Sequence, residues 1–69
     1  MNITFDKEAD ALYIEFSKGE FGSNKEIDDN TIIDLDKKGN ILGIEMLSVS
    51  KRISKEALSE VNFKNLVAA

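Results

Sequence analysis

The sequence predicts one α+β domain: an antiparallel sheet of four to five strands, made of two β-hairpins, with one C-terminal helix packed on one face. Two patterns along the chain predict this class. Apolar and polar residues alternate through most of residues 1–47, and a repeat of two is typical of strands with one buried face. From residue 54 the apolar repeat lengthens to about 3.6 residues, which is typical of a helix. With 69 residues the chain has room for a single domain, 1–69, with the sheet over 1–47 and the helix over 54–66.

Residues 2–6 and 11–16 predict the first hairpin. Ile3 and Phe5 alternate with polar residues in the first segment, and a second alternation begins at residue 11. The polar run 6–10 between them is typical of a turn. We therefore expect the two segments to pair as antiparallel strands.

Residues 31–36 and 41–46 predict the second hairpin. The loop 36–40 between them carries Gly39 near its end, which fits a type I turn closed by a residue in the left-handed conformation. In the second strand, the alternation predicts that one face carries Leu42, Ile44 and Met46.

Two further features complete the predicted sheet. Residues 17–24 contain two glycines and predict a loop, after which 25–28 predict a short strand. Gly43 lies inside a predicted strand, where glycine indicates that a large neighbour approaches closely. Tyr13, on the same face, is the candidate neighbour.

The helix is predicted from its N-terminal signals and its apolar stripe. Ser54 is suited to cap the first turn, and Ile53 and Leu58 are spaced for a hydrophobic staple. Ala57, Leu58 and Val61 then make a narrow apolar stripe. The predicted core of the domain comprises Ile3, Phe5, Leu12, Ile14, Phe16, Ile33, Leu35, Leu42, Ile44, Met46, Leu58 and Val61.

The composition excludes several classes of function. The chain has no cysteine and no histidine, which removes disulfides, thiol nucleophiles, cysteine-built zinc sites and the commonest general base near pH 7. The net charge of −4 repels phosphate, and basic and aromatic residues do not interleave, so we expect no nucleic-acid partner. No apolar run approaches the ~20 residues that cross a bilayer, and the N-terminus lacks a signal pattern. We therefore expect a cytoplasmic protein with no membrane partner and no cofactor.

Acidic residues invite a metal-binding interpretation. Residues 34–45 place Asp, Asp, Gly and Glu at four positions of a calcium-binding EF-hand loop, but Lys38 occupies a ligand position and the flanks alternate as strands. More loosely, the polar face of the predicted sheet carries Glu15, Asp34, Asp36 and Glu45. We interpret these carboxylates as the solvated face of a one-sided sheet. The alternative is a small metal-dependent hydrolase that uses Asp34, Asp36 and Glu45.

The C-terminal region carries the candidate partner-binding residues. Residues 1–50 hold 5 basic and 11 acidic side chains, a net charge of −6, whereas 51–69 hold 4 basic and 2 acidic ones, a net charge of +2. A basic cluster and an apolar patch are the candidates, and they comprise Lys51, Arg52, Lys55, Phe63, Leu66 and Val67. The basic cluster either binds an anionic partner at the helix start or is a solvated turn. The apolar patch either docks on a partner or closes the core.

Three ordered blocks resemble the small prokaryotic domain-of-unknown-function 2283 family. They are FDKEADALYI at 5–14, IDDNTIIDLD at 27–36 and GNILGIEML at 39–47, the last followed by SKR at 50–52. The resemblance covers residues 3–53, and Phe5 replaces the more usual tyrosine of the opening block. The resemblance implies no known enzymatic activity and transfers no catalytic residue. Members are often encoded beside another small protein suspected of being a toxin, so it also implies an antitoxin-like binding role.

Together these observations predict a non-enzymatic protein-interaction module. Its expected partner is another small protein, for example a basic toxin, or a second copy of itself in a homodimer. The acidic sheet would attract a basic partner, and the C-terminal segment would dock. The alternatives are the metal-dependent hydrolase above and a structural domain that only self-associates.

Overall fold

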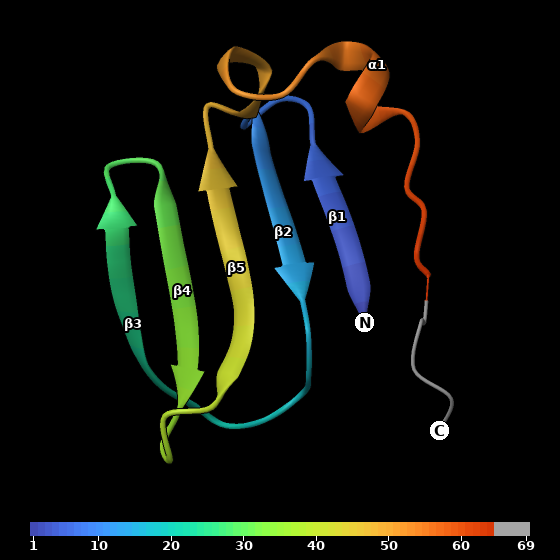
Figure 1. The fold of residues 1–69 in the computed structure, drawn as a ribbon. Helices are drawn as coiled ribbons and strands as arrows, with labels where there is room; N and C mark the ends of the chain where they lie inside the picture. Colours follow the sequence, from blue (N-terminus) through green and yellow to red (C-terminus); the bar gives the residue numbers. More distant parts are fainter. Residues whose placement is uncertain (65–69) are drawn as a thin grey trace.

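The computed structural model describes residues 1–64 and confirms a five-stranded antiparallel sheet followed by a short helical region (Figure 1). The strands are β1 (Asn2–Asp6), β2 (Ala11–Glu15), β3 (Phe21–Asp28), β4 (Thr31–Asp36) and β5 (Ile41–Leu47). A 3-10 turn, η1 (Val49–Lys51), and the helix α1 (Lys55–Leu58) follow. In this described part no helix is long and apolar enough to cross a membrane.

The strand order is β1-β2-β5-β4-β3, so the last strand lies in the middle of the sheet. Both predicted hairpins are confirmed, because β1 pairs with β2 and β4 pairs with β5. The pairing of β2 with β5 joins them into one sheet. In Figure 1, β1 and β3 form the two edges.

Residues paired across the strands divide the sheet into two chemically different faces. One face, here the apolar face, carries the rows Ile3–Ile14–Ile44–Ile33–Lys25 and Phe5–Leu12–Met46–Thr31–Asp28. The other, here the polar face, carries the rows Thr4–Tyr13–Glu45–Ile32–Glu26 and Asn2–Glu15–Gly43–Asp34–Asn24. Side chains of directly paired residues point to the same side, so each row is a continuous line across the sheet. The first row places four isoleucines side by side, one from each of four strands. Each of them is one of the apolar residues that alternate with polar ones along its strand.

Strand β3 is longer than the sequence predicted. It begins at Phe21 rather than at residue 25, and its pairing with β4 starts at Phe21 opposite Asp36. The register shifts between Phe21 and Ser23, and a Cβ on Gly22 would lie 2.7 Å from the backbone of Asp36. Glycine therefore allows the close approach of two backbones here. The sequence analysis took the same glycine as a sign of a loop, so it could not foresee that the strand begins earlier.

The sequence predicted that Leu42 shares a face with Ile44, and this prediction is wrong. The register of β4 and β5 shifts so that Asp34 pairs with Gly43 whereas Leu35 pairs with Ile41, which leaves Leu42 as the extra residue of a bulge. A bulge residue interrupts the alternation of side chains. Leu42 is buried and lines a hollow together with Tyr13 and Asp34, on the side of the polar face.

Among the described residues, one left-handed residue lies in the turn of each predicted hairpin. Gly39 has φ 87°, and its N–H donates to the carbonyl oxygen of Asp36 at 3.1 Å, which confirms the predicted turn of the second hairpin. Asp10, which ends the turn of the first hairpin, has φ 53°. Aspartate tolerates this conformation better than most residues.

The helix predicted over 54–66 is much shorter. Ser54 caps it as expected, because its Oγ accepts from the N–H of Ala57 at 3.1 Å, but α1 ends at Leu58. Val61 and Phe63 are 66% and 75% exposed, so the segment beyond α1 buries no apolar face that would extend the helix. Short helices are marginal without such burial. The last part of the predicted helix, beyond residue 64, lies outside the described residues.

The core is smaller than predicted and partly different. Among residues 1–64 the buried apolar side chains are Leu12, Leu42 and Val49, and only the first two belong to the predicted core. Of the other predicted members, Val61 is exposed, as are Ile3, Phe5 and Phe16 at 44%, 37% and 37%. The remainder are half-buried: Ile14, Ile33, Leu35, Ile44, Met46 and Leu58. The reason is that the sheet is a single layer, with a Cα envelope of 35 × 35 × 18 Å, whereas the prediction assumed a helix lying across it.

Candidate interaction surfaces

The apolar face is the most extensive candidate surface. Of its central residues, Leu12 is buried, but Ile14, Ile33, Ile44 and Met46 are only half-buried, although isoleucine and methionine usually lie inside a fold. At its β1 edge, Ile3 and Phe5 are 44% and 37% exposed. The only charged residues of its two rows, Lys25 and Asp28, lie in the edge strand β3. The middle of this face is therefore uncharged, apolar and open.

A groove extends the apolar face at the end of β1. In Figure 1, α1 stands beyond that end of the sheet rather than across its middle. The groove between them has a volume of about 810 Å³, and Phe5, Ile53 and Leu58 supply its apolar lining. Lys55, one of the predicted partner-binding residues, lies here together with Lys7. The groove thus combines an apolar lining with two ammonium groups and the carboxylate of Asp10, which accepts hydrogen bonds from Ser50.

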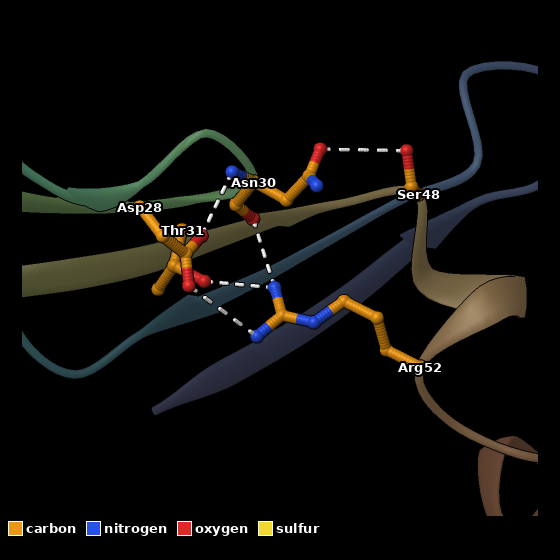
Figure 2. A network of polar contacts seen from close by, with 5 residues as sticks. All are labelled: Asp28, Asn30, Thr31, Ser48 and Arg52. Atoms are coloured by element: carbon orange, nitrogen blue, oxygen red, sulfur yellow. Dashed lines mark hydrogen bonds and ion pairs between the residues drawn. The ribbon is translucent and has the colours of Figure 1, made fainter.

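Arg52 is held within the chain instead of facing the groove. Figure 2 shows its guanidinium directed at the turn between β3 and β4. Nη1 donates to Thr31 Oγ1 at 2.8 Å and to the carbonyl oxygen of Asn30 at 3.1 Å, while Nη2 lies 3.9 Å from Asp28 Oδ2. The side chain of Ser48 completes the network through a 3.4 Å bond to that of Asn30. This network ties η1 to the β3–β4 turn, so the structure separates Arg52 from Lys55.

The remaining predicted partner-binding residues are not gathered into one site. Lys51 is exposed at the end of η1, and Phe63 is 75% exposed in the segment after α1. Leu66 and Val67 lie outside the described residues. At the helix start, the Ser54 side chain accepts a hydrogen bond from the N–H of Ala57, one amide of the first turn.

Tyr13 is the centre of the polar face. Its hydroxyl donates to Asp34 Oδ2 at 3.3 Å, and Glu15 and Glu45 lie nearby on the same face. Partial burial, and then the negative charge of Asp34 and its hydrogen bond, raise the pKa of Tyr13, with smaller contributions from the two glutamates. A hollow of about 330 Å³ adjoins this group, between the strands and the loop that carries Gly19. As predicted, Tyr13 also covers Gly43, where a Cβ would lie 2.6 Å from its Cζ.

Asp36 has a structural role in the turn of the second hairpin. Its Oδ1 accepts from the N–H groups of Lys38 and Asn40 at 2.9 and 2.8 Å, and its Oδ2 accepts from Asn40 Nδ2 at 3.1 Å. The bonds from Asn40, followed by those from the turn amides, lower the pKa of Asp36. In residues 1–64 no three acidic side chains are grouped so that they could hold a metal ion. The structure thus places Asp36 in a turn and Asp34 and Glu45 beside Tyr13.

A clasp between the β1–β2 turn and η1, at one end of the sheet, escaped the sequence analysis. Ser50 donates twice to Asp10, from its Oγ to Oδ2 at 2.7 Å and from its N–H to Oδ1 at 3.0 Å. Next to it, Val49 donates its N–H to the carbonyl oxygen of Asp10 and is completely buried. The two residues that form the clasp are 40 positions apart, so no local pattern indicates their contact.

The comparisons with known proteins identify a family. The model of the family described as "Protein of unknown function (DUF2283)" matches residues 2–50, which span β1 to β5 and most of η1. No curated protein and no solved structure matches the chain. The matched region holds the turn residues Asp10, Asp36 and Gly39 and the close contact of Tyr13 with Gly43, all described above. Since the match covers most of the chain, the protein belongs to the domain-of-unknown-function 2283 family.

Proposed function

We propose that this protein is a non-enzymatic protein-interaction module whose binding surface is the apolar face. The observation that carries the proposal is the row of four isoleucines across β1, β2, β5 and β4, one exposed and three only half-buried, on a sheet of one layer. Small domains normally cover such a face with a second layer. Large exposed apolar surfaces in proteins mark sites of interaction.

The polar face supports the same proposal in a second way. Its two rows contain four carboxylates and no basic residue: Glu15, Glu26, Asp34 and Glu45. A surface of one sign steers an oppositely charged partner during association. The polar face would draw a basic partner such as a small toxin toward the chain at long range, while the contacts themselves form on the apolar face, and the antitoxin-like role implied by the family resemblance stays a prediction. We place the module in the cytosol.

The absence of cysteine allows a direct test of the binding surface. A cysteine introduced by Ile33→Cys reports on the apolar face, and one introduced by Ile32→Cys reports on the polar face from the neighbouring position of the same strand. Both isoleucines are half-buried, so the two thiols start from similar surroundings. The rate of thiol labelling is measured in dilute protein, in concentrated protein and in the presence of the protein encoded beside it.

We expect that a higher concentration of the protein itself, or the protein encoded beside it, slows thiol labelling of the Ile33→Cys variant at least tenfold. The labelling rate of the Ile32→Cys variant should stay unchanged. Since labelling requires access to the thiol, slower labelling means that a protein covers the apolar face. Equal labelling of both positions under all conditions would refute the proposed function.

A further inference from the structure

We infer that the apolar face is covered by the same face of a second copy of this chain, giving a two-layer sandwich with the acidic faces outside. This inference rests on the proposed function and adds the identity of the partner. Three features of the described residues support it: the surface area of the chain, the distribution of charge between the faces, and the form of the sheet edges.

The first feature is an excess of accessible surface. The chain exposes 5630 Å². A folded monomer of 7.7 kDa is expected to expose about 4,300 Å², so the excess is about 1,300 Å². Each partner in a standard protein complex buries about 800 Å². The excess is therefore larger than the area that one partner of a standard complex buries.

The second feature is the charge of the two faces. In the paired rows, the polar face has four carboxylates, whereas Lys25 and Asp28 balance each other at one edge of the apolar face. Stacking polar faces would bring eight like charges together, about 10 Å apart. Stacking apolar faces buries the isoleucine rows against each other and keeps every one of these carboxylates in water. A two-fold axis presents the same patch from both copies, so the uncharged face is complementary to itself.

The third feature argues against association through the sheet edges. The edge strand β3 has two register shifts, after Phe21 and after Glu26, and it presents Lys25 and Glu26 between them. Bulges and charged side chains discourage the addition of another strand. The other edge strand, β1, has only five residues. Pairing at an edge would only widen the same layer, whereas face-to-face packing, with strand directions about 30° apart, gives the sheet a second layer.

The test is sedimentation velocity of the full chain between about 1 and about 100 µM, a range in which moderate protein complexes dissociate. It compares the wild type with Ile33→Glu on the apolar face and Ile32→Lys on the polar face. Each new charge lies opposite a residue of opposite sign, Lys25 for the first and Glu26 and Glu45 for the second, so each monomer accommodates it. Far-UV circular dichroism checks that both variants fold.

We expect a dimer for the wild type and for Ile32→Lys, and a dissociation constant about 100-fold higher for Ile33→Glu, because two carboxylates must then lose water in the middle of an apolar interface. Since a dimer couples folding to concentration, the unfolding midpoint also rises with protein concentration in the wild type. If Ile33→Glu does not fold, Ile3→Glu and its control Thr4→Glu replace the pair. These two positions are exposed neighbours on opposite faces of β1.

A wild type that stays monomeric throughout, or equal weakening by both variants, would overturn the inference. If the wild type is a monomer, and the thiol of the Ile33→Cys variant is protected only when a different protein is added, the proposed function stands with a different partner. A monomer whose thiol at position 33 is protected even in dilute solution would mean that the chain covers its own face, and both proposals would fail.

Discussion

Replacing Gly43 with alanine tests whether the centre of the sheet is as tightly packed as the structure indicates. A Cβ at this position would lie 2.6 Å from Tyr13 Cζ and 2.7 Å from the carbonyl oxygen of Ile14, and it would also meet the Tyr13 hydroxyl. Real Cβ contacts are longer than 3.0 Å, so something must move. The tyrosine can swing away by giving up its 3.3 Å bond to Asp34, but the Ile14 carbonyl belongs to the ladder between β2 and β5.

The size of the effect follows from two opposing contributions. Overpacking of this kind costs about 1–3 kcal/mol of unfolding free energy. The loss of glycine flexibility in the unfolded chain returns about 0.4–1 kcal/mol. We therefore expect Gly43→Ala to lower the free energy of unfolding by about 1–2 kcal/mol. In a domain of this size that corresponds to a fall in the melting temperature of roughly 5–15 °C.

Urea unfolding followed by far-UV circular dichroism, at one fixed protein concentration, measures this cost. Repeating Gly43→Ala in a Tyr13→Ala background should reduce its cost by at least about 0.5 kcal/mol, because one of the two obstacles is gone. Gly39→Ala is the matched control. Its φ of 87° makes it costly, but nothing lies within 4 Å of its Cβ, so Tyr13→Ala should not change its cost. A Gly43→Ala protein as stable as the wild type, or a cost that is the same in both backgrounds, would refute the reasoning.

Three further predictions concern single side chains. Asp34→Asn should lower the raised pKa of Tyr13, because the negative charge beside the hydroxyl disappears; since the chain has one tyrosine, its absorbance near 295 nm reports that pKa directly. The lowered pKa of Asp36 stabilises the fold at pH values above the ordinary aspartate pKa of about 3.9, and this contribution is lost as pH falls through the lowered value. Urea midpoints measured from pH 6 to pH 2 should therefore fall less steeply in Asp36→Asn than in the wild type, and parallel curves would contradict this. Asp10→Ala should lower the free energy of unfolding by about 2 kcal/mol, because it breaks two hydrogen bonds and places alanine at φ 53°. Ser50→Ala removes only one of these bonds and should lower the free energy of unfolding by about 1 kcal/mol. The same urea titration checks this pair, and equal costs would show that the conformation of residue 10 is unimportant.

Local signals predicted the hairpins, one of their turn residues, one tertiary contact and the start of α1. Alternation identified β1, β2, β4 and β5, because each has one apolar face. Gly39 predicted a left-handed residue in the turn, and Gly43 predicted the close approach of Tyr13. Ser54 marked the true start of α1. Each of these depends on a few neighbouring residues or on the conformational freedom of glycine, so each is visible in the sequence.

The candidate surfaces were less predictable. The sequence analysis assigned Arg52 to a partner site, but its guanidinium bonds Asn30 and Thr31 on a turn that is remote in sequence. The clasp between Asp10 and Ser50 was not foreseen for the same reason. A polar side chain shows no sign, in the sequence, of whether its partner is water, another protein or its own chain.

By itself, then, the sequence determined the type of each main strand, the chemical difference between the two faces, and the absence of thiol and imidazole chemistry. Only the tertiary structure decided that β5 lies in the middle of the sheet, that a bulge turns Leu42 to the other side, and that α1 ends at Leu58. The physical reason is that strand order and helix length depend on burial between distant segments, whereas alternation is a local property. The short helix leaves the isoleucine rows open, and that uncovered face is the main indication of what this protein does.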